Sequence, residues 1–212
     1  MMDIIAHRGY WLEEIEKNSY KAFERALKNG FGVETDLRDL NGYLVISHDI
    51  PNIGAMKCSQ LSQLYQKYPV SAPIALNIKS DGLHILVKEF IEKTQFKNTF
   101  VFDMAVPDMR GYLKNKTPIF TRKSEYEMHP AFLDLCNGIW LDAFESDWYG
   151  TEIIENLVKK NKKIVIVSPE LHGRQHLALW DLIRNSGFHR NALLSICTDF
   201  PMMAKEYFCG KN

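Results

Sequence analysis

Charged and imidazole side chains follow short apolar runs at three places in the first fifty residues of the chain. They are His7, Arg8, Glu34, Asp36 and His48. Two histidines, whose ordinary pKa is about 6.5, suit the donation and the acceptance of protons in one reaction. An arginine binds an anion through its planar fork, and two carboxylates hold a divalent cation. Groups of these kinds, gathered at strand ends, have the chemistry needed to cut a phosphate ester.

Two pairs of residues have the spacing that places side chains on one face of a strand. Glu34 and Asp36 are two apart, so both carboxylates can point toward one cation, and oxygen ligands favour Mg²⁺ or Ca²⁺. Asn77 and Lys79 repeat this spacing in a later apolar run. Asn77 offers a neutral carbonyl oxygen to the cation, and Lys79 offers a positive charge to a phosphate oxygen. Taken singly, each pair also fits a solvated strand end or a surface lysine.

Apolar runs alternate with amphipathic stretches along almost the whole chain, the pattern expected of a parallel sheet built from βα units. Eight runs are predicted as its strands: residues 3–6, 32–37, 73–78, 99–102, 117–120, 138–141, 163–167 and 192–197. Residues 43–47 are predicted as an extra strand beside the second. Eight such units favour a TIM-type (β/α)8 barrel, an α/β fold formed by residues 1–212 as a single domain with a short insertion after the second strand.

The stretches between these strands carry ordinary helix signals. Asn18 or Ser19 is expected to cap the first helix, and Gly30 is expected to end it. Further helices are predicted over residues 83–92, 153–160, 177–185 and 202–207. Because the apolar residues of these helices repeat at helical spacing, we assign them to the core.

The composition excludes several classes of function. Lysine plus arginine and aspartate plus glutamate both number 26, and no segment concentrates basic residues, so no nucleic-acid partner is expected. The four cysteines are widely separated, as in a protein with reduced thiols. No window is apolar enough for a transmembrane segment, and the first apolar run leads directly into His7, unlike a signal peptide. We expect a cytoplasmic protein and leave its oligomeric state open.

Several motifs give the chain a specific family resemblance. The N-terminal part of the chain resembles that of the glycerophosphodiester phosphodiesterase family. The resemblance lies in residues 7–9 (His-Arg-Gly), 32–36 (Gly-Val-Glu-Thr-Asp) and 41–49 (Asn-Gly-Tyr-Leu-Val-Ile-Ser-His-Asp). The resemblance resumes at residues 76–79 (Leu-Asn-Ile-Lys) and at residues 198–201 (Thr-Asp-Phe-Pro), after the last strand. It therefore frames nearly the whole chain.

This resemblance implies a barrel that hydrolyses small phosphodiesters with the help of a divalent cation. The family's site residues fall on catalytic His7 and His48, on phosphate-binding Arg8 and Lys79, and on metal-binding Glu34 and Asp36. Asn77 stands where the family usually has a third metal-binding carboxylate, which predicts a weaker or altered cation site. Residues 49–73 also form a shorter segment than the family's usual insertion, so a more open mouth is expected.

The loop after residues 163–167 supplies further candidate site residues. Glu170 is a candidate replacement for the missing carboxylate if it turns inward, and a solvated loop acid otherwise. His172 and Arg174 are candidate contacts to a second phosphate, a sugar or a polar headgroup. The alternative for both is an exposed polar loop that contacts no ligand.

Three functions fit these residues. The first is hydrolysis of a glycerophosphodiester-like substrate. The second is that of the related phospholipase D toxins, which share the framework but transfer the phosphoryl group within the substrate to give a cyclic phosphate. The third is a barrel that binds phosphoesters but has lost hydrolysis through Asn77. Because the histidine pair, the basic pair and the two carboxylates are all present, the hydrolase is the favoured interpretation.

Overall fold

The strands of the computed structural model, which describes residues 1–210, form a ring of parallel pairs. In that described part, eight strands make the barrel: β1 (Asp3–His7), β2 (Gly32–Leu40), β5 (Ile74–Ile78), β6 (Thr99–Phe102), β7 (Phe120–Lys123), β8 (Gly138–Leu141), β9 (Lys163–Val167) and β10 (Leu194–Thr198). Parallel pairing runs from β7 through β8, β9, β10, β1, β2 and β5 to β6. The ring closes through a bridge between Val101 in β6 and Ile119 just before β7. The TIM-type barrel expected from the sequence is confirmed.

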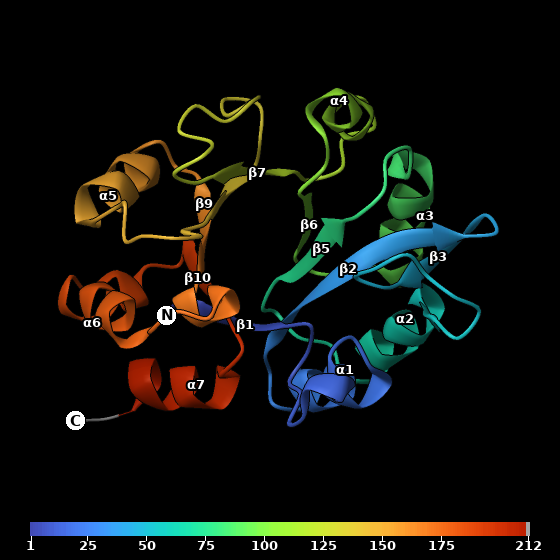
Figure 1. Ribbon diagram of the computed structural model, residues 1–212, viewed down its shortest axis with the longest axis horizontal. Helices are drawn as coiled ribbons and strands as arrows, with labels where there is room; N and C mark the ends of the chain where they lie inside the picture. The colour runs from blue at the N-terminus through green and yellow to red at the C-terminus, as the bar shows by residue number, and fades with distance from the viewer. Residues whose placement is uncertain (211–212) are drawn as a thin grey trace.

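Helices surround the barrel in chain order (Figure 1). They are α1 (Tyr20–Lys28), α2 (Cys58–Lys67), α3 (His84–Thr94), α4 (Val106–Lys114), α5 (Thr151–Lys159), α6 (Leu177–Asn185) and α7 (Pro201–Cys209). As predicted, Ser19 caps α1: its side chain accepts a hydrogen bond from the N–H of Ala22. Gly30, at φ 80°, follows the end of this helix. No helix among residues 1–210 has the length and apolar character that crossing a membrane requires.

Apolar side chains that alternate along the strands fill the interior of the barrel. They are Ile5, Ala75, Phe100, Phe102, Phe120, Trp140, Val165, Val167 and Cys197. Phe100 stacks on Phe120 with ring centroids 3.7 Å apart, and Phe102 stacks on Trp140 at 3.9 Å. Because side chains two apart share a face, the next positions along these strands point into the C-terminal mouth of the barrel. The floor of the mouth is therefore apolar, and polar residues line its walls.

An antiparallel extension forms the insertion after β2. β3 (Tyr43–Ile46) pairs with the C-terminal half of β2, and β4 (Met56–Lys57) pairs with β3. Asn41 and Gly42 both have positive φ and make the tight turn between β2 and β3. The extra strand predicted at residues 43–47 thus matches β3 to within one residue. This pairing places the residues that follow β3 beside β2, and therefore beside the candidate site.

The sequence prediction differs most from the structure at β7, at the short strand β4, which it lacks, and at two helices. The strand expected at residues 117–120 lies at Phe120–Lys123 instead. Pro118 has no N–H group, and the N–H of Ile119 donates to the side chain of Asn137, so regular pairing with β8 begins only at Phe120. The prediction also lacks α2 and α4. In α4 a proline occupies the first turn, where its missing N–H costs nothing.

Candidate active site

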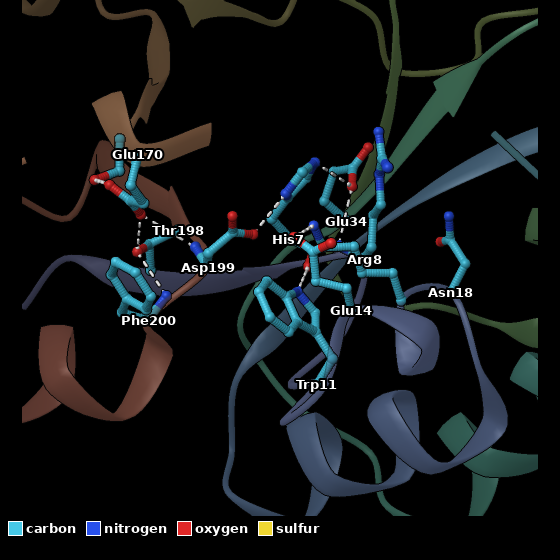
Figure 2. A network of polar contacts seen from close by, with 12 residues as sticks. His7, Arg8, Trp11, Glu14, Asn18, Glu34, Glu170, Thr198, Asp199 and Phe200 are labelled. Atoms are coloured by element: carbon cyan, nitrogen blue, oxygen red, sulfur yellow. Dashed lines mark hydrogen bonds and ion pairs between the residues drawn. The ribbon is translucent and has the colours of Figure 1, made fainter. Parts of the chain in front are cut away.

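His7 ends β1 between two carboxylates at the mouth of the barrel (Figure 2). Its Nδ1 lies 2.7 Å from Oδ1 of Asp199, which follows β10, and its Nε2 lies 3.8 Å from Oε2 of Glu34 in β2. β1 pairs with both of these strands, which is why residues from the two ends of the chain meet here. A carboxylate on one ring nitrogen fixes the orientation of an imidazole. His7 is thus held in place, with its other nitrogen directed toward Glu34.

The turn after β1 brings the backbone of Arg8 into the site. Arg8 has a φ of 55° and Gly9 a φ of 86°, so the chain turns sharply behind His7. The N–H of Arg8 donates to Oε2 of Glu34 at 3.2 Å. A side chain at Gly9 would come within 2.8 Å of Ala22 in α1. Glycine at this position therefore permits both the turn and the close packing of α1 beneath it.

Asp36 in β2 is buried and has several donors around it. It is 1% exposed and lies 3.2 Å from Nε of Arg8 and 3.3 Å from Nζ of Lys79. Its Oδ2 accepts a hydrogen bond from the side-chain amide of Asn18 at 2.8 Å. The carbonyl oxygen of Asn18 in turn accepts from the hydroxyl of Thr35 at 2.8 Å. Asp36 therefore brings together the two basic residues that the sequence predicts as phosphate ligands.

Glu34 is less well compensated than its neighbour on β2. Burial raises the pKa of Glu34 from 4.5 to about 7, and repulsion from Asp36 adds to the effect. His7, Arg8 and Lys79 lower this pKa without cancelling the rise. A buried carboxylate that is costly to ionise indicates a place where an added cation is favourable.

Three oxygen-bearing side chains at the ends of β2 and β5 suit a divalent cation. Asp36 and Asn77 are directly paired in the sheet, and both are buried. Oδ1 of Asn77 is buried without a hydrogen-bond partner in residues 1–210. An unpartnered amide oxygen beside Glu34 and Asp36 fits the ligand preference of a hard cation. The described residues contain no cluster of three or more His, Cys, Asp or Glu side chains that could hold a metal, so the candidate set depends on this amide.

His48 lies at the rim of the same mouth. The N–H of Ser47 donates to the carbonyl of Asp36 at 3.0 Å, which places His48 next to β2. Nδ1 of His48 lies 2.8 Å from Oδ1 of Asp49. The imidazole is 46% exposed, against 15% for His7, and within residues 1–210 no hydrogen bond or ion pair joins the two histidines. The structure thus gathers the other sequence-predicted residues of β1, β2 and β5 and leaves His48 beside them.

Glu170 turns toward β10, on the far side of Asp199 from Glu34 (Figure 2). Its Oε1 accepts from the N–H of Asp199 at 3.1 Å and from the hydroxyl of Thr198. Its Oε2 accepts from the hydroxyl of Ser168. These contacts direct both oxygens of Glu170 away from the candidate cation site. They hold Asp199, and through it His7, in position.

The remaining predicted residues of this loop contact the end of β8. Nε2 of His172 lies 2.7 Å from Oδ1 of Asp142. Arg174 donates to the carbonyl of Ala143 at 2.9 Å and pairs with Asp147. The side chains of His172 and Arg174 are about a quarter exposed, at 23% and 22%. The loop is therefore packed against the neighbouring strand end and not free in solvent.

Asp199 is the site residue to which the sequence analysis gives no role. It stands in the Thr-Asp-Phe-Pro segment directly after the last strand, where barrel enzymes carry functional groups. That strand-end position is the signal from which a role can be inferred. Its partner His7 is 192 residues away in the chain, so local spacing does not reveal the contact.

Comparison with known proteins gives structural matches without a sequence match. No family model and no curated protein sequence matches the chain. A glycerophosphodiester phosphodiesterase from Agrobacterium tumefaciens has a TM-score of 0.70 at 17% identity, over 99% of this chain and 100% of that one. A phosphodiesterase from Oleispira antarctica, in complex with the product sn-glycerol-3-phosphate, has a TM-score of 0.68 at 13% identity, over 98% and 97%. A glycerophosphoryl diester phosphodiesterase from Parabacteroides distasonis has a TM-score of 0.69 at 14% identity, over 99% and 86%.

These matches extend over nearly the full length of the chain, from the strand that ends in His7 to the helix after Asp199. At such low identity the likeness shows the fold, and one barrel architecture supports many chemistries. The chain therefore has the α/β barrel fold of the glycerophosphodiester phosphodiesterases that it resembles.

Proposed function

We propose that the protein is a metal-dependent phosphoric diester hydrolase that cleaves a small, glycerophosphodiester-like substrate. The observation that carries this proposal is the junction of β1, β2 and β10, where Asp199 holds His7 beside Glu34. An oriented imidazole next to a poorly compensated carboxylate and two basic side chains supplies the roles that phosphodiester cleavage needs. The likeness of the barrel to phosphodiesterases, one of them bound to sn-glycerol-3-phosphate, supports the proposal.

Arg8 and Lys79 are the proposed phosphate ligands. Both lie within hydrogen-bonding or ion-pair distance of Asp36, at 3.2 and 3.3 Å, so their positive charges are close together. The planar guanidinium of Arg8 suits two phosphate oxygens at once, and the ammonium of Lys79 acts as a point charge. Their combined charge stabilises the negative charge that accumulates on the non-bridging oxygens during cleavage.

Glu34, Asp36 and Asn77 are the proposed ligands of a divalent cation, Mg²⁺ or Ca²⁺. When bound, such a cation polarises the phosphoryl oxygens as a Lewis acid. The chain contributes three side-chain oxygens from two paired strands, and Asn18 keeps Asp36 oriented. Since Asn77 adds no negative charge, we expect the cation to be held less tightly than by three carboxylates.

His7 and His48 are the proposed proton carriers. Asp199 holds Nδ1 of His7, which leaves Nε2 for proton transfer at the reacting oxygens. His48, beside Asp36 at the open rim, is proposed to serve the opposite side of the phosphate. One histidine takes the proton of the attacking water, and the other gives a proton to the departing alcohol.

Hydrolysis of bis(p-nitrophenyl) phosphate in the presence of Mg²⁺ tests this proposal. We expect turnover by the wild-type protein and its loss in His7→Ala and in His48→Ala, with unchanged circular dichroism. The exposed His129 provides a matched control, because His129→Ala also removes an imidazole but leaves the site intact. Near-normal turnover in His7→Ala or in His48→Ala would contradict its assignment as a proton carrier.

Phosphorus NMR of the products of a glycerophosphodiester, whose glycerol carries the hydroxyl that cyclisation requires, then identifies the reaction. A phosphate monoester as the first product supports hydrolysis by water. A cyclic phosphate contradicts direct hydrolysis and indicates transfer within the substrate. Binding of the phosphodiester without cleavage in Mg²⁺, Ca²⁺ and Mn²⁺ contradicts both reactions and indicates a phosphoester-binding barrel.

We also propose a cytoplasmic location. Cys58, Cys136 and Cys197 are buried thiols and Cys209 is an exposed one, and all four are free. Free thiols are typical of a reducing compartment. Immunodetection after cell fractionation checks this proposal, and recovery of the protein outside the cytoplasm would contradict it.

A further inference from the structure

A cavity of about 500 Å³ lies at the end of the barrel opposite to the candidate active site. The candidate active site is built at the C-terminal ends of strands, whereas the lining of this cavity comes from their N-terminal ends. The residues concerned are Asn98 just before β6, Pro118 before β7, Asn137 just before β8, Lys163 at the start of β9 and Leu193 just before β10. The volume lies within the range of small-molecule sites.

The hollow results from the way the ring closes between β6 and β7. The N–H of Val101 donates to the carbonyl of Pro118 at 2.9 Å, and regular pairing of β7 with β8 begins only at Phe120. The segments that lead into β6 and β7 are therefore not held together by a ladder of hydrogen bonds. The ring of Phe120 stacks on Phe100 at 3.7 Å and closes the cavity toward the interior of the barrel.

Two amide side chains of the lining present hydrogen-bond donors to the cavity. Nζ of Lys163 lies 3.3 Å from Oδ1 of Asn98. The N–H of Ile119 donates to Oδ1 of Asn137 at 3.0 Å. Because both amide oxygens are engaged, the NH2 groups of Asn98 and Asn137 remain available to a ligand. Donors of this kind suit an anion or another acceptor.

Positive charge at the cavity has no compensating carboxylate in the lining. Lys97 and Lys163 both contribute to the lining, and no aspartate or glutamate does. Burial raises the pKa of Asp3, and the positive charge of Lys163 partly opposes this rise, so one carboxylate lies near the cavity without lining it. The cavity therefore has an excess of positive charge, which favours an anion.

The rest of the lining is largely apolar and firmly packed. Phe96 packs edge-on against Tyr65 and Phe90, with ring centroids 4.7 and 5.5 Å apart. Together with Pro118 and Leu193, it gives the cavity an apolar side. An inorganic anion would leave this side in contact with water, whereas a ligand with an apolar body would cover it.

We propose that this cavity binds a small phosphate monoester that has an apolar body. Lys97 and Lys163 attract the phosphate dianion as point charges. The NH2 groups of Asn98 and Asn137 donate to its oxygens, and the apolar body lies against Phe96. The site is separate from the residues that would cleave a phosphodiester, so this inference goes beyond the proposed function and does not depend on it.

An NMR titration of the ¹⁵N-labelled wild-type protein with phenyl phosphate in EDTA tests the inference. The side-chain NH2 signals of Asn98 and Asn137 should shift together with a single Kd, because both amides donate to one phosphate. The NH2 signals of Asn18 and Asn77 report on the mouth in the same spectra, so binding there is measured separately. Shifts confined to Asn18 and Asn77 would overturn the inference.

Two further ligands test the chemical class. Inorganic phosphate lacks the apolar body, so at Asn98 and Asn137 it should bind at least about tenfold more weakly than phenyl phosphate. Benzoate keeps the ring but carries a single charge, and it should also bind at least about tenfold more weakly. Equal affinity for inorganic phosphate would contradict the apolar part of the site. Equal affinity for benzoate would contradict the assignment to a phosphate.

Matched variants test the individual contacts. N137D keeps the oxygen that accepts the N–H of Ile119 but replaces the donor with a negative charge, so the Kd read from Asn98 should rise at least about tenfold. K97M and K163M keep the apolar stem of each lysine and should each raise this Kd about fivefold. K114M removes an exposed lysine at the end of α4 that does not line the cavity, and it should leave the Kd unchanged.

The outcomes separate this inference from the proposed function. An unchanged Kd in folded N137D, K97M and K163M would overturn the inference, as would an equal rise in K114M. If N137D fails to fold, as judged by circular dichroism, the two lysine variants decide. A protein that cleaves no phosphodiester but shows the expected shifts at Asn98 and Asn137 disproves the hydrolase and retains this site. A protein that cleaves phosphodiesters without those shifts disproves the site and retains the hydrolase.

Discussion

In the half of the mouth formed by β1, β2 and β5, negative charge lacks full compensation, whereas in the half formed by β6 to β9 it is largely paired. Burial raises the pKa of Glu34 to about 7, and the oxygen of Asn77 has no partner in residues 1–210. Across the mouth, Asp142 is paired with His172, and Asp103 is paired with an arginine. The charges of the first half therefore favour an added cation, whereas those of the second half already compensate one another. Compensation of charge, and not the number of charged residues, distinguishes the two halves.

The largest expected difference between the two halves is in kcat, when one histidine in each half is replaced by phenylalanine. His7→Phe removes a proposed proton carrier, and we expect kcat for bis(p-nitrophenyl) phosphate to fall about 1000-fold. His172→Phe should change the same kcat less than about twofold, because the proposed reaction gives this imidazole no role in proton transfer. Steady-state kinetics with both purified variants measures the contrast. Similar losses of kcat in the two variants would contradict the proposed difference between the two halves.

Neutralising Glu34 should stabilise the protein in a pH-dependent way. The folded state holds the proton of Glu34 more tightly than the unfolded chain, since burial raises its pKa from 4.5 to about 7. The free energy of unfolding therefore falls as the pH rises through this interval and stays low above it. Glu34→Gln avoids this cost, so we expect it to be more stable than the wild type by up to about 3 kcal/mol at pH 8 in EDTA, and equally stable near pH 4.

Urea denaturation at both pH values measures this effect. Addition of Mg²⁺ at pH 8 should stabilise the wild-type protein and not the Glu34→Gln variant, because the variant lacks a proposed ligand. An equal gain from Glu34→Gln at pH 4 and at pH 8 would show that its cause is packing and not charge.

Weakening the contact between Asp199 and His7 should lower kcat less than removing the imidazole of His7. Asp199→Asn keeps the volume of the side chain but weakens the hold on Nδ1, which lies 2.7 Å from the carboxylate. We expect a loss of about 10-fold to 100-fold in kcat with little change in KM, because the phosphate ligands are untouched. A change confined to KM would indicate that Asp199 contacts the substrate directly.

Adding a carboxylate to the half of the mouth formed by β1, β2 and β5 should strengthen cation binding there. Asn77→Asp supplies the negative charge that the candidate cation site lacks, so Mg²⁺ affinity should increase about 10-fold. Asn77→Ala is the matched control and should weaken binding, because it removes the unpartnered oxygen. Calorimetric titration with Mg²⁺ measures both variants. Unchanged affinity in Asn77→Asp would show that position 77 does not contact the cation.

The sequence is sufficient to predict the barrel and the grouping of residues on β2 and β5, because both depend on short periodicities. The spacing of Glu34 with Asp36 and of Asn77 with Lys79 follows from the alternation of a strand. The contact of His7 with Asp199 and that of Glu170 with Asp199 depend on which strands become neighbours. Glu170 in particular turns toward β10 because a hydroxyl and an N–H there meet its carboxylate, a choice that no local pattern expresses.

The closure of the ring between β6 and β7 has a consequence for motion. The N–H of Val101 donates to the carbonyl of Pro118 at 2.9 Å, but proline has no N–H to return. The N–H of Ile119 donates to the side-chain oxygen of Asn137, and the carbonyl of Ile119 accepts from the backbone N–H of Asn137. Neither group of Ile119 is therefore available to β6. This seam therefore has fewer cross-strand bonds than the joints beside β1, and its amides should exchange with deuterium first. A transient opening there would move the wall beside Arg122, whereas the pairing of β1 with β2 and β10 would keep His7 in place.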